Sequence, residues 1–267
     1  MGVLNVTPDS FSDGGAFLTA EKALRQAQVF CRQGAEIIDI GAESTRPGSD
    51  LVSPAEQISR LRDVVWAVAQ LGVHVSIDTT SAEVAEFALQ AGADIINDVS
   101  AGRSDPGMLP LAAETGAPII LMHMLGEPRT MQADPRYKDV VSEVFDFLAE
   151  RMEVAVAAGV RRDRIIIDPG IGFGKRLEHN LALLAGVGRL LRLDRPVLVG
   201  PSRKRFIGEL TGIEKPQRRG WGTIAACLAC RRRGATLLRV HDVGGLLQAL
   251  GVADAIEAAD DSKNAFP

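Results

Sequence analysis

Short apolar runs recur along the chain, and five of them follow an amphipathic segment that ends at a glycine. Runs of a few branched apolar residues are typical of strands buried on both faces. Glycine is preferred just after a helix because it enters the left-handed region without a steric penalty. We therefore predict five helix–glycine–strand units, at "QGAEIIDIG", "LGVHVSIDT", "AGADIINDV", "TGAPIILMH" and "RGATLLRVH", with the glycines at Gly34, Gly72, Gly92, Gly116 and Gly234.

Three further apolar runs, "GVLNVTP", "RIIIDPG" and "PVLVGPS", bring the predicted number of strands to eight. Helical patterns lie between the runs, and two of them have clear start signals. Ser53-Pro-Ala-Glu56 and Thr80-Ser-Ala-Glu83 both have the spacing of a capping box, the first with Pro54 at the first helical position. Strand and helix are therefore predicted to alternate throughout.

Eight strand–helix units in a chain of 267 residues match the size of a closed (β/α)₈ barrel. An open doubly wound sheet would alternate in the same way, but it seldom reaches eight repeats without a second domain. The sequence shows no linker or low-complexity tract. We therefore predict an α/β fold, a single-domain (β/α)₈ TIM barrel over residues 1–258, followed by a C-terminal tail over residues 259–267.

Composition narrows the possible partners. The net charge of -4 gives no general attraction to nucleic acid or to an anionic membrane surface. No apolar run approaches the length of a membrane span, and no signal peptide precedes the first strand, so we expect a cytoplasmic protein. Cys227 and Cys230 lack the second pair of ligands that a zinc site would need, and we interpret them as small apolar positions on a helix.

Polar residues follow every predicted strand. In this fold the active site lies where strands end and loops begin, so these side chains are expected to meet at one rim. An aspartate after a strand is often only a turn former, and we assign that part to Asp39, as a buried acceptor that holds the strand-to-loop turn. The residues at the strand ends are Asn5, Asp39, Asp78, Asn97 with Asp98, His123, Asp168, Ser202 to Lys204, and Arg239 with His241.

The rim residues divide into two chemical groups, which we expect on opposite sides of the rim. The acceptors Asp78, Asn97 and Asp168 suit a flat heterocycle that carries several N–H donors. The cationic group would form a local anion site, because guanidinium forks match phosphate oxygens. Its members are Arg46, Arg203, Lys204, Arg239 and His241.

Two long loops and one glycine-rich stretch complete the candidate site. The loops "TPDSFSDGG" and "ESTRPGSDLVSP" are polar and too long for tight turns, so we expect lids that order over a ligand. The stretch "DPGIGFGK" at 168–175 matches neither the P-loop nor the dinucleotide fingerprint. It is therefore not predicted to bind phosphate.

Eight motifs, in order and spanning nearly the whole chain, resemble those of the dihydropteroate synthase family. The resemblance implies a (β/α)₈ barrel that condenses 6-hydroxymethyl-7,8-dihydropterin diphosphate with para-aminobenzoate in folate biosynthesis. It also implies Mg²⁺ and a homodimer. The motifs are "MGVLNVTPDSFSDGG", "IDIGAESTRPG", "SIDT", "NDVS", "MHMLGEPRTMQ", "DPGIGFGK", "SRKRF" and "RVHDV".

The same resemblance implies a role for each matching residue, with Arg46, Lys204, Arg239 and His241 as the catalytic group. The pterin would be bound by Asp78, Asn97, Met122, Asp168 and Lys204. The diphosphate would be bound by Asn5, Thr45, Arg46, Arg239 and His241, with Asn5 also meeting the Mg²⁺. The aminobenzoate pocket would be lined by Phe11, Thr45, Pro47, Phe173 and Ser202. "DPGIGFGK" would then be the floor of the pterin site, its glycines letting the backbone lie close to the flat ring.

Two alternatives stay open at this point. A corrinoid-dependent methyltransferase would share the pterin residues, but it would have no use for Arg239, His241 and the two loops. A catalytically silent relative would bind pterin without turnover. The chain departs from the family pattern at Ala42, where a second glycine is usual, and it begins at the first predicted strand, where family members usually have a preceding segment.

Overall fold

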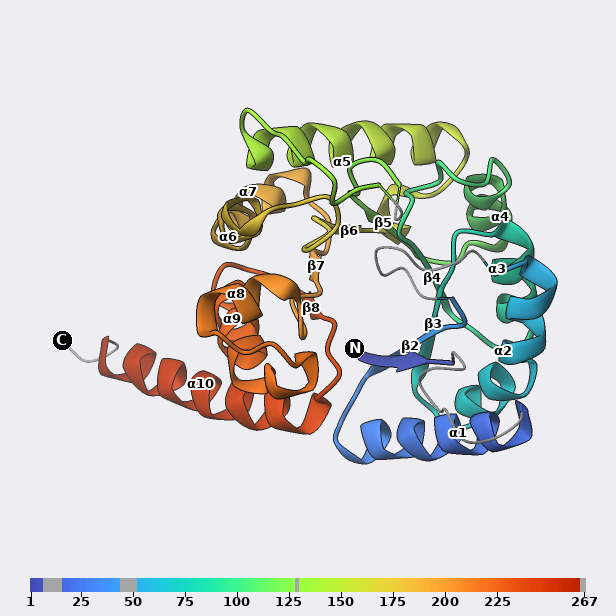
Figure 1. Ribbon diagram of the computed structural model, residues 1–267, viewed down its shortest axis with the longest axis horizontal. Helices are drawn as coiled ribbons and strands as arrows, with labels where there is room; N and C mark the ends of the chain where they lie inside the picture. Colours follow the sequence, from blue (N-terminus) through green and yellow to red (C-terminus); the bar gives the residue numbers. More distant parts are fainter. Residues whose placement is uncertain (7–15, 44–51, 128–129, 265–267) are drawn as a thin grey trace.

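The computed structural model describes residues 1–6, 16–43, 52–127 and 130–264. Within these ranges, eight parallel strands lie inside a ring of helices (Figure 1). The strands are β1 (Gly2–Asn5), β2 (Ile37–Gly41), β3 (His74–Asp78), β4 (Ile95–Asp98), β5 (Ile119–Met122), β6 (Ile165–Asp168), β7 (Leu198–Val199) and β8 (Leu237–Leu238). The α-helices are α1 (Ala16–Arg32), α2 (Pro54–Ala69), α3 (Ala82–Gln90), α4 (Met108–Thr115), α5 (Val140–Ala157), α6 (Leu177–Ala185), α7 (Val187–Leu190), α8 (Arg205–Thr211), α9 (Gly220–Arg231) and α10 (Val243–Asn264). Three 3₁₀ turns, η2 (Arg162–Arg164), η3 (Leu191–Leu193) and η4 (Pro216–Arg218), complete the order.

The strands close into a barrel. Strands β1 to β6 pair in sequence order, and β7 pairs with β8. Two isolated bridges join these sheets, Ile167 with Val197 on one side and Gly2 with Val240 on the other. The backbone N–H of Val3 also donates to the carbonyl of Val240 over 2.9 Å. The predicted (β/α)₈ barrel is therefore confirmed, with β7 and β8 as its shortest strands.

Side chains inside the barrel change from apolar to polar along the strands. Near the strand starts one apolar cluster contains Ile95, Ile120 and Leu198, packed with Met1, Ile37, Ile166 and Leu237. Residues two positions apart on a strand point to the same face, so the next interior layer holds the residues two positions further on. Four of these are Asp39, Asn97, Met122 and Asp168. The period of the strands therefore directs polar groups toward the carboxyl end of the barrel.

Helix α2 shows how local sequence sets an element. Ser53 caps it, since the Ser53 Oγ accepts a hydrogen bond from the Glu56 N–H over 3.3 Å, and Pro54 occupies the first turn, as predicted. Its buried residues recur with helical spacing and pack on the outer face of the sheet. They are Gln57, Leu61, Val64, Val65 and Val68.

The predicted start of the next helix is wrong by one residue. The N-cap of α3 is Ser81 and not Thr80, because the Ser81 Oγ accepts from the Val84 N–H over 3.5 Å. The hydroxyl of Thr79, one residue before the predicted cap, accepts from the Ser81 N–H over 3.2 Å. Thr79, Thr80 and Ser81 are consecutive hydroxyl residues, so the sequence offered more than one possible N-cap for this helix.

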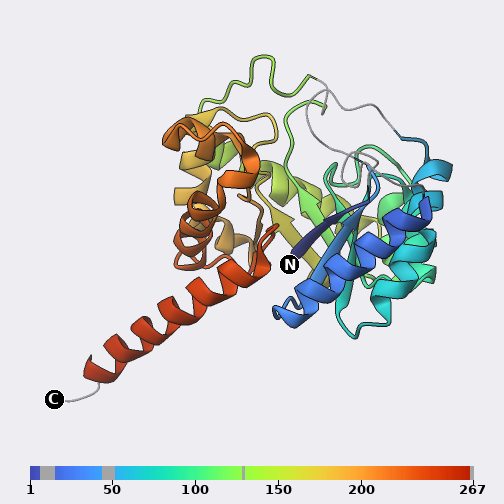
Figure 2. The same cartoon turned by 60° about the horizontal axis from the view of Figure 1, so that its bottom comes forward.

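Other expectations about the helices can be compared with the structure. All five unit glycines have positive φ, between 69° and 106°, as their predicted place after helices requires. Cys227 and Cys230 are fully buried on α9, which confirms them as small core positions. Helix α10 continues through residue 258 to Asn264 and projects from the body (Figure 2), and the proposed division of the chain at residue 258 stays a prediction. Among the described helices, none is both long and apolar enough to cross a bilayer.

Candidate functional site

A small cavity opens where the strands end. All five residues that the family resemblance assigns to the pterin border it, and Arg239 borders it with them. The lining residues are Asp78, Asn97, Val99, Met122, Asp168, Ile171, Phe173, Gly200, Lys204 and Arg239. The fold therefore brings together side chains from β3, β4, β5 and β6 and from the loops after β6, β7 and β8.

Strand register connects Asn5 to two of these residues. Asn5 pairs with Gly41, Gly41 with Asp78, and Asp78 with Asn97. A Cβ atom on Gly41 would lie 3.3 Å from the Cβ of Asp78, so the side chain missing at Gly41 leaves room for Asp78. Asn5 therefore ends its strand in register with Asp78 and Asn97, the acid and amide groups of two neighbouring strands.

Arg239 lies between two carboxylates. Its Nε donates to Asp39 Oδ2 over 2.6 Å, and its Nη2 donates to Asp78 Oδ2 over 2.7 Å. Asn97 Nδ2 donates to the same Asp39 oxygen over 3.1 Å. Burial acts to lower the pKa of Arg239, but the charges of Asp39 and Asp78 outweigh it and hold that pKa above its ordinary value. The guanidinium is therefore a permanent cation with a fixed orientation.

This arrangement corrects two predictions. Asp39 is a buried acceptor, as expected, but it lies in the middle of β2 and binds Arg239 and Asn97 instead of holding a turn. The cations were expected on the opposite side of the rim from the acceptors, and this is wrong for Arg239, which donates directly to Asp78. Arg239 is 200 positions from Asp39 and 161 positions from Asp78, so no local sequence pattern could indicate these ion pairs.

The two carboxyls expected to meet the pterin have raised pKa values. Burial raises the pKa of Asp78 to about 7, with Arg239 partly offsetting the effect. Burial likewise raises the pKa of Asp168 to about 6, although the Gly170 N–H donates to its Oδ1 over 2.7 Å. A further N–H donor that enters the cavity would therefore stabilise the ionised form of each carboxyl.

The "DPGIGFGK" loop packs tightly against its neighbours. Gly170, Gly172 and Gly174 all have positive φ, at 67°, 83° and 63°. A Cβ on Gly170 would lie 1.9 Å from the carbonyl oxygen of His123, and one on Gly174 would lie 2.8 Å from that of Leu125. The glycines were expected to admit a flat ring, but contacts within the protein already require at least these two.

A buried pair that the sequence did not reveal joins this loop to the loop after β5. Lys175 Nζ lies 2.9 Å from His123 Nδ1 and donates to the carbonyl of Phe173 over 2.9 Å. Burial lowers the pKa of Lys175 to about 7 and, with the charge of Lys175 adding to the effect, that of His123 to about 2. His123, expected at the rim, therefore serves as a neutral contact between loops and does not line the cavity.

Ser202 and His241 form a second polar pair. The Ser202 Oγ lies 2.9 Å from His241 Nδ1 and also accepts from the backbone N–H of His241 over 3.2 Å. A hydroxyl can donate one hydrogen and accept two, so the tautomer of His241 decides which atom donates in this contact. The residues predicted for aminobenzoate and for diphosphate are thus in direct contact.

Two other polar residues of the predicted rim do not border the cavity. Asp98 accepts from the N–H groups of Ser100 and Gly102, over 2.8 Å and 2.6 Å, which is the turn-forming role. Arg203 has a φ of 59° and its N–H donates to Thr223 Oγ1 over 3.0 Å. Proximity to a strand end was therefore not enough to predict a cavity residue.

Four predicted site residues cannot be placed. Phe11, Thr45, Arg46 and Pro47 lie outside the described residues, as does much of the two long loops expected to act as lids. Their assignment to diphosphate and aminobenzoate stays a prediction. Of the described residues with a predicted role, Asn5, Ser202 and His241 are not among those bordering the cavity.

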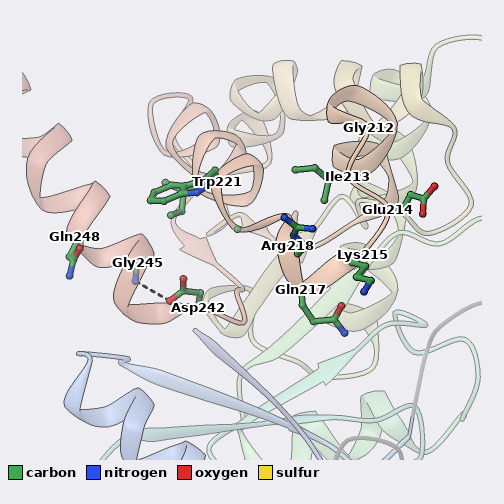
Figure 3. A pocket seen from close by; sticks show the side chains of 12 residues that line it. Gly212, Ile213, Glu214, Lys215, Gln217, Arg218, Trp221, Asp242, Gly245 and Gln248 are labelled. Atoms are coloured by element: carbon green, nitrogen blue, oxygen red, sulfur yellow. Dashed lines mark hydrogen bonds between the residues drawn. The ribbon is translucent and has the colours of Figure 1, made fainter.

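A second, larger cavity lies beside α9 and contains none of the predicted binding residues (Figure 3). Its walls come from the segment between α8 and α9, the start of α9 and the first turns of α10. The lining residues are Gly212, Ile213, Glu214, Lys215, Gln217, Arg218, Gly220, Trp221, Ile224, Asp242, Gly245 and Gln248. We refer to it as the α9 groove.

Comparisons with known proteins agree with the geometry of the first cavity. Residues 1–241 match the family of pterin binding enzymes. The chain is 48% identical to the dihydropteroate synthase of Synechocystis sp., over 96% of this chain and 89% of the relative. Among solved structures, Xanthomonas albilineans dihydropteroate synthase with 4-aminobenzoic acid is 48% identical with a TM-score of 0.91, covering 97% of this chain and 92% of that one. The same enzyme in complex with 7,8-dihydropteroate is 46% identical with a TM-score of 0.87, covering 97% and 93%.

Proposed function

The chain belongs to the dihydropteroate synthase family, and from this premise we propose that it joins 6-hydroxymethyl-7,8-dihydropterin diphosphate to para-aminobenzoate. The products are 7,8-dihydropteroate and diphosphate, and the reaction is a transfer that forms a C–N bond in folate biosynthesis. The observation that carries the proposal is the single cavity shared by Asp78, Asn97, Asp168, Lys204 and Arg239.

The proposed pterin site uses the acceptors of this cavity. Asp168 accepts from the pterin amino group and ring N–H, since a carboxylate offers two oxygens to two neighbouring donors. Asp78 and Asn97 meet the other edge of the ring, Lys204 donates to the ring acceptors, and Met122 packs on its face. Support comes from the burial of these groups, because a desolvated carboxylate gains more from a ligand donor than an exposed one does.

The leaving group is assigned to Arg239, His241 and Asn5, together with Thr45 and Arg46 of the second loop. One Nη of Arg239 donates to Asp78. We propose that the pterin takes over Asp78, so that this Nη turns to a diphosphate oxygen while Nε stays on Asp39. A proton on His241 Nε2 would add a second donor.

The proposed mechanism is a dissociative displacement at the pterin methylene. As the C–O bond breaks, positive charge develops on the methylene and ring, and the electron pair leaves with the diphosphate. The carboxylates stabilise the first charge and Arg239 the second, an electrostatic effect that is often worth several kcal/mol. The amine of aminobenzoate then attacks the methylene and loses a proton, so the reaction needs no strong base.

The aminobenzoate is assigned to Ser202 and Phe173, with Phe11, Thr45 and Pro47 of the long loops. Phe173 borders the cavity, and Lys204 Nζ lies 4.1 Å from the centroid of its ring. With this cation–π contact, Lys204 would lie between the proposed pterin and aminobenzoate sites. It supports Lys204 as a member of the catalytic group.

Mg²⁺ is part of the proposal, with Asn5 as its protein ligand. Among the described residues no cluster of three or more His, Cys, Asp or Glu could hold a metal ion. The single amide oxygen of Asn5 suits Mg²⁺, which keeps several waters and is usually bound by one or two protein groups together with substrate phosphates. When bound it would neutralise charge on the diphosphate. Asn5 would orient it from the end of β1, in register with Asp78 through Gly41.

A homodimer and a cytoplasmic location complete the proposal. Support for the dimer comes from α9 and α10, which expose Trp221, Val252 and Ile256 by 85%, 62% and 57%. Val252 and Ile256 are four residues apart and so share one face of α10, which projects from the body (Figure 2). The three cysteines are free thiols, which accords with a reducing compartment. Light scattering on a size-exclusion column would test the dimer.

The direct test incubates the protein with labelled aminobenzoate, the pterin diphosphate and Mg²⁺, and measures labelled dihydropteroate and released diphosphate. Product that requires all three additions supports the proposal. Pterin binding without product would identify a catalytically silent relative. Chelation of the metal should abolish turnover while leaving binding of a pterin without diphosphate unchanged. The reason is that the substrate would meet the ion only through its diphosphate.

A further inference from the structure

We infer that Arg219 is a positioning residue, which holds the segment Ser202–Lys204 in the geometry that both substrates require. The inference rests on the proposed function and adds a residue that has no contact with the cavity. Arg219 lies between η4 and α9, outside every motif that carried the family resemblance.

The guanidinium of Arg219 binds four backbone carbonyls. Its Nη1 donates to the carbonyls of Arg203 and Lys204, over 3.0 Å and 3.3 Å. Its Nε donates to that of Ile213 over 2.9 Å, and its Nη2 to that of Glu214 over 2.6 Å. One side chain thus ties the segment after β7 to the segment before α9. Only arginine has enough donors in a rigid plane to do this.

The bonded segment contains a strained residue. Arg203 has a φ of 59°, a left-handed conformation that is unfavourable for a residue with a Cβ atom. Its N–H donates to Thr223 Oγ1 over 3.0 Å, and that hydroxyl donates to the carbonyl of Arg219 over 2.9 Å. The peptide N–H of Arg203 is therefore held by Thr223 in the first turn of α9, and its carbonyl by Arg219, the N-cap of that helix. Such strain persists only where the surroundings over-determine it.

Helix α8 leaves the space that the guanidinium needs. A Cβ atom on Gly208 would lie 2.6 Å from Arg219 Nη2 and 2.7 Å from the carbonyl oxygen of Ile213. Any side chain at this position would displace the guanidinium or the carbonyl that it binds. The glycine in α8 and the arginine before α9 therefore form one arrangement.

The segment held by Arg219 supplies several contacts of the site. Ser202 is bonded to His241, and Lys204 borders the cavity over the ring of Phe173. Misplacing a catalytic or binding group by about 1 Å can lower the rate about 100-fold. Ile213 and Glu214 also form a wall of the α9 groove (Figure 3), so Arg219 connects that wall to the cavity.

The test begins with Arg219→Met, which keeps the apolar stem and removes all donors. We expect kcat/KM to fall about 10- to 100-fold and the affinity for 6-hydroxymethylpterin, measured by calorimetry, to fall about tenfold. Arg218→Met, in the adjacent and exposed residue, is the matched control and should change neither. Arg219→Lys retains some donors, should lose less, and serves if the Met variant does not fold.

A double-mutant cycle separates positioning from a general loss of stability. If Arg219 acts through Lys204, the pair Lys204→Met and Arg219→Met should weaken turnover and pterin binding scarcely more than Lys204→Met alone. Effects on pterin affinity that multiply, or an Arg219→Met protein with a lower melting temperature but unchanged kcat/KM and pterin affinity, would overturn the inference. Wild-type protein that binds pterin without forming dihydropteroate would instead remove the proposed function, and the binding measurements would still decide the role of Arg219.

Discussion

Replacing Arg239 with methionine is expected to cost both stability and activity, and the loss of stability should depend on pH. The guanidinium is the shared partner of Asp39, which is fully buried, and Asp78, whose side chain is only 10% exposed. Removing one member of a buried ion pair typically costs about 3–5 kcal/mol, because a desolvated charge is left alone. In a protein of this size that loss lowers the melting temperature by about 10 °C.

The sign of the pH effect follows from Asp78. Its pKa in the folded protein is about 7, above the ordinary 3.8, and the charge of Arg239 lowers it. A raised carboxyl pKa stabilises the protein at low pH, and this contribution is lost as the pH rises through about 7. Without Arg239 the pKa of Asp78 rises further, so the folded variant binds more protons than the wild type near and above pH 7. The variant should therefore be much less stable than the wild type at pH 8 and only moderately so at pH 5.

Urea unfolding at pH 5, 6, 7 and 8 measures this difference. Arg232→Met is the control, because Arg232 pairs with Glu257 over 3.1 Å at the surface, with side chains 62% and 50% exposed, and its removal should matter little at any pH. Dihydropteroate formation by Arg239→Met should also fall about 100- to 1000-fold. A stability loss that is the same at pH 5 and pH 8, or no greater than that of the control, would refute this account of Arg239.

Three further predictions test the surroundings of the cavity. Gly170→Ala should lower the free energy of unfolding in urea by about 3 kcal/mol or more, since its Cβ would lie 1.9 Å from the His123 carbonyl oxygen. The control Gly72→Ala, which has a similar φ and open space around it, should lose about 1 kcal/mol, and equal losses would contradict the close approach at Gly170. Lys175→Met should cost about 1–3 kcal/mol because His123 Nδ1 loses its partner, and an unchanged urea midpoint would show that this buried contact contributes nothing. Pterin affinity, measured by calorimetry, should fall as the pH drops from 7.5 to 5, because Asp78 and Asp168, with pKa values of about 7 and about 6, accept fewer hydrogen bonds once protonated, and a flat profile over this range would exclude both as main acceptors.

The fold could be predicted because its signals are local. Glycine after a helix, a few branched residues for a strand, and a serine with proline at a helix start each act within a few positions. Eight short apolar runs, five of them preceded by such a glycine, favoured a barrel, and the strand ends then indicated one edge. Where the local signal was ambiguous, as at Thr80 and Ser81, the predicted boundary was wrong by one residue.

The sequence predicted which residues line the candidate site better than it predicted how they contact one another. Asp78, Asn97, Met122, Asp168 and Lys204 share one cavity, as their positions at strand ends and their motifs suggested. The sequence alone did not predict that Asp39 would be a partner of Arg239, because a buried acceptor gives the same pattern whether it holds a turn or a cation.

What the sequence determined by itself is therefore the order of strands and helices, the alternation that carries polar groups into the barrel mouth, and the family to which the motifs belong. Only the tertiary structure decided which polar groups meet. Arg239 binds the carboxylates of Asp39 and Asp78, and Arg219 binds the backbone carbonyls of Arg203 and Lys204. The physical reason is one of range. Backbone propensity and side-chain period act between near neighbours, whereas ion pairs form between residues that closure of the barrel brings together from distant parts of the chain.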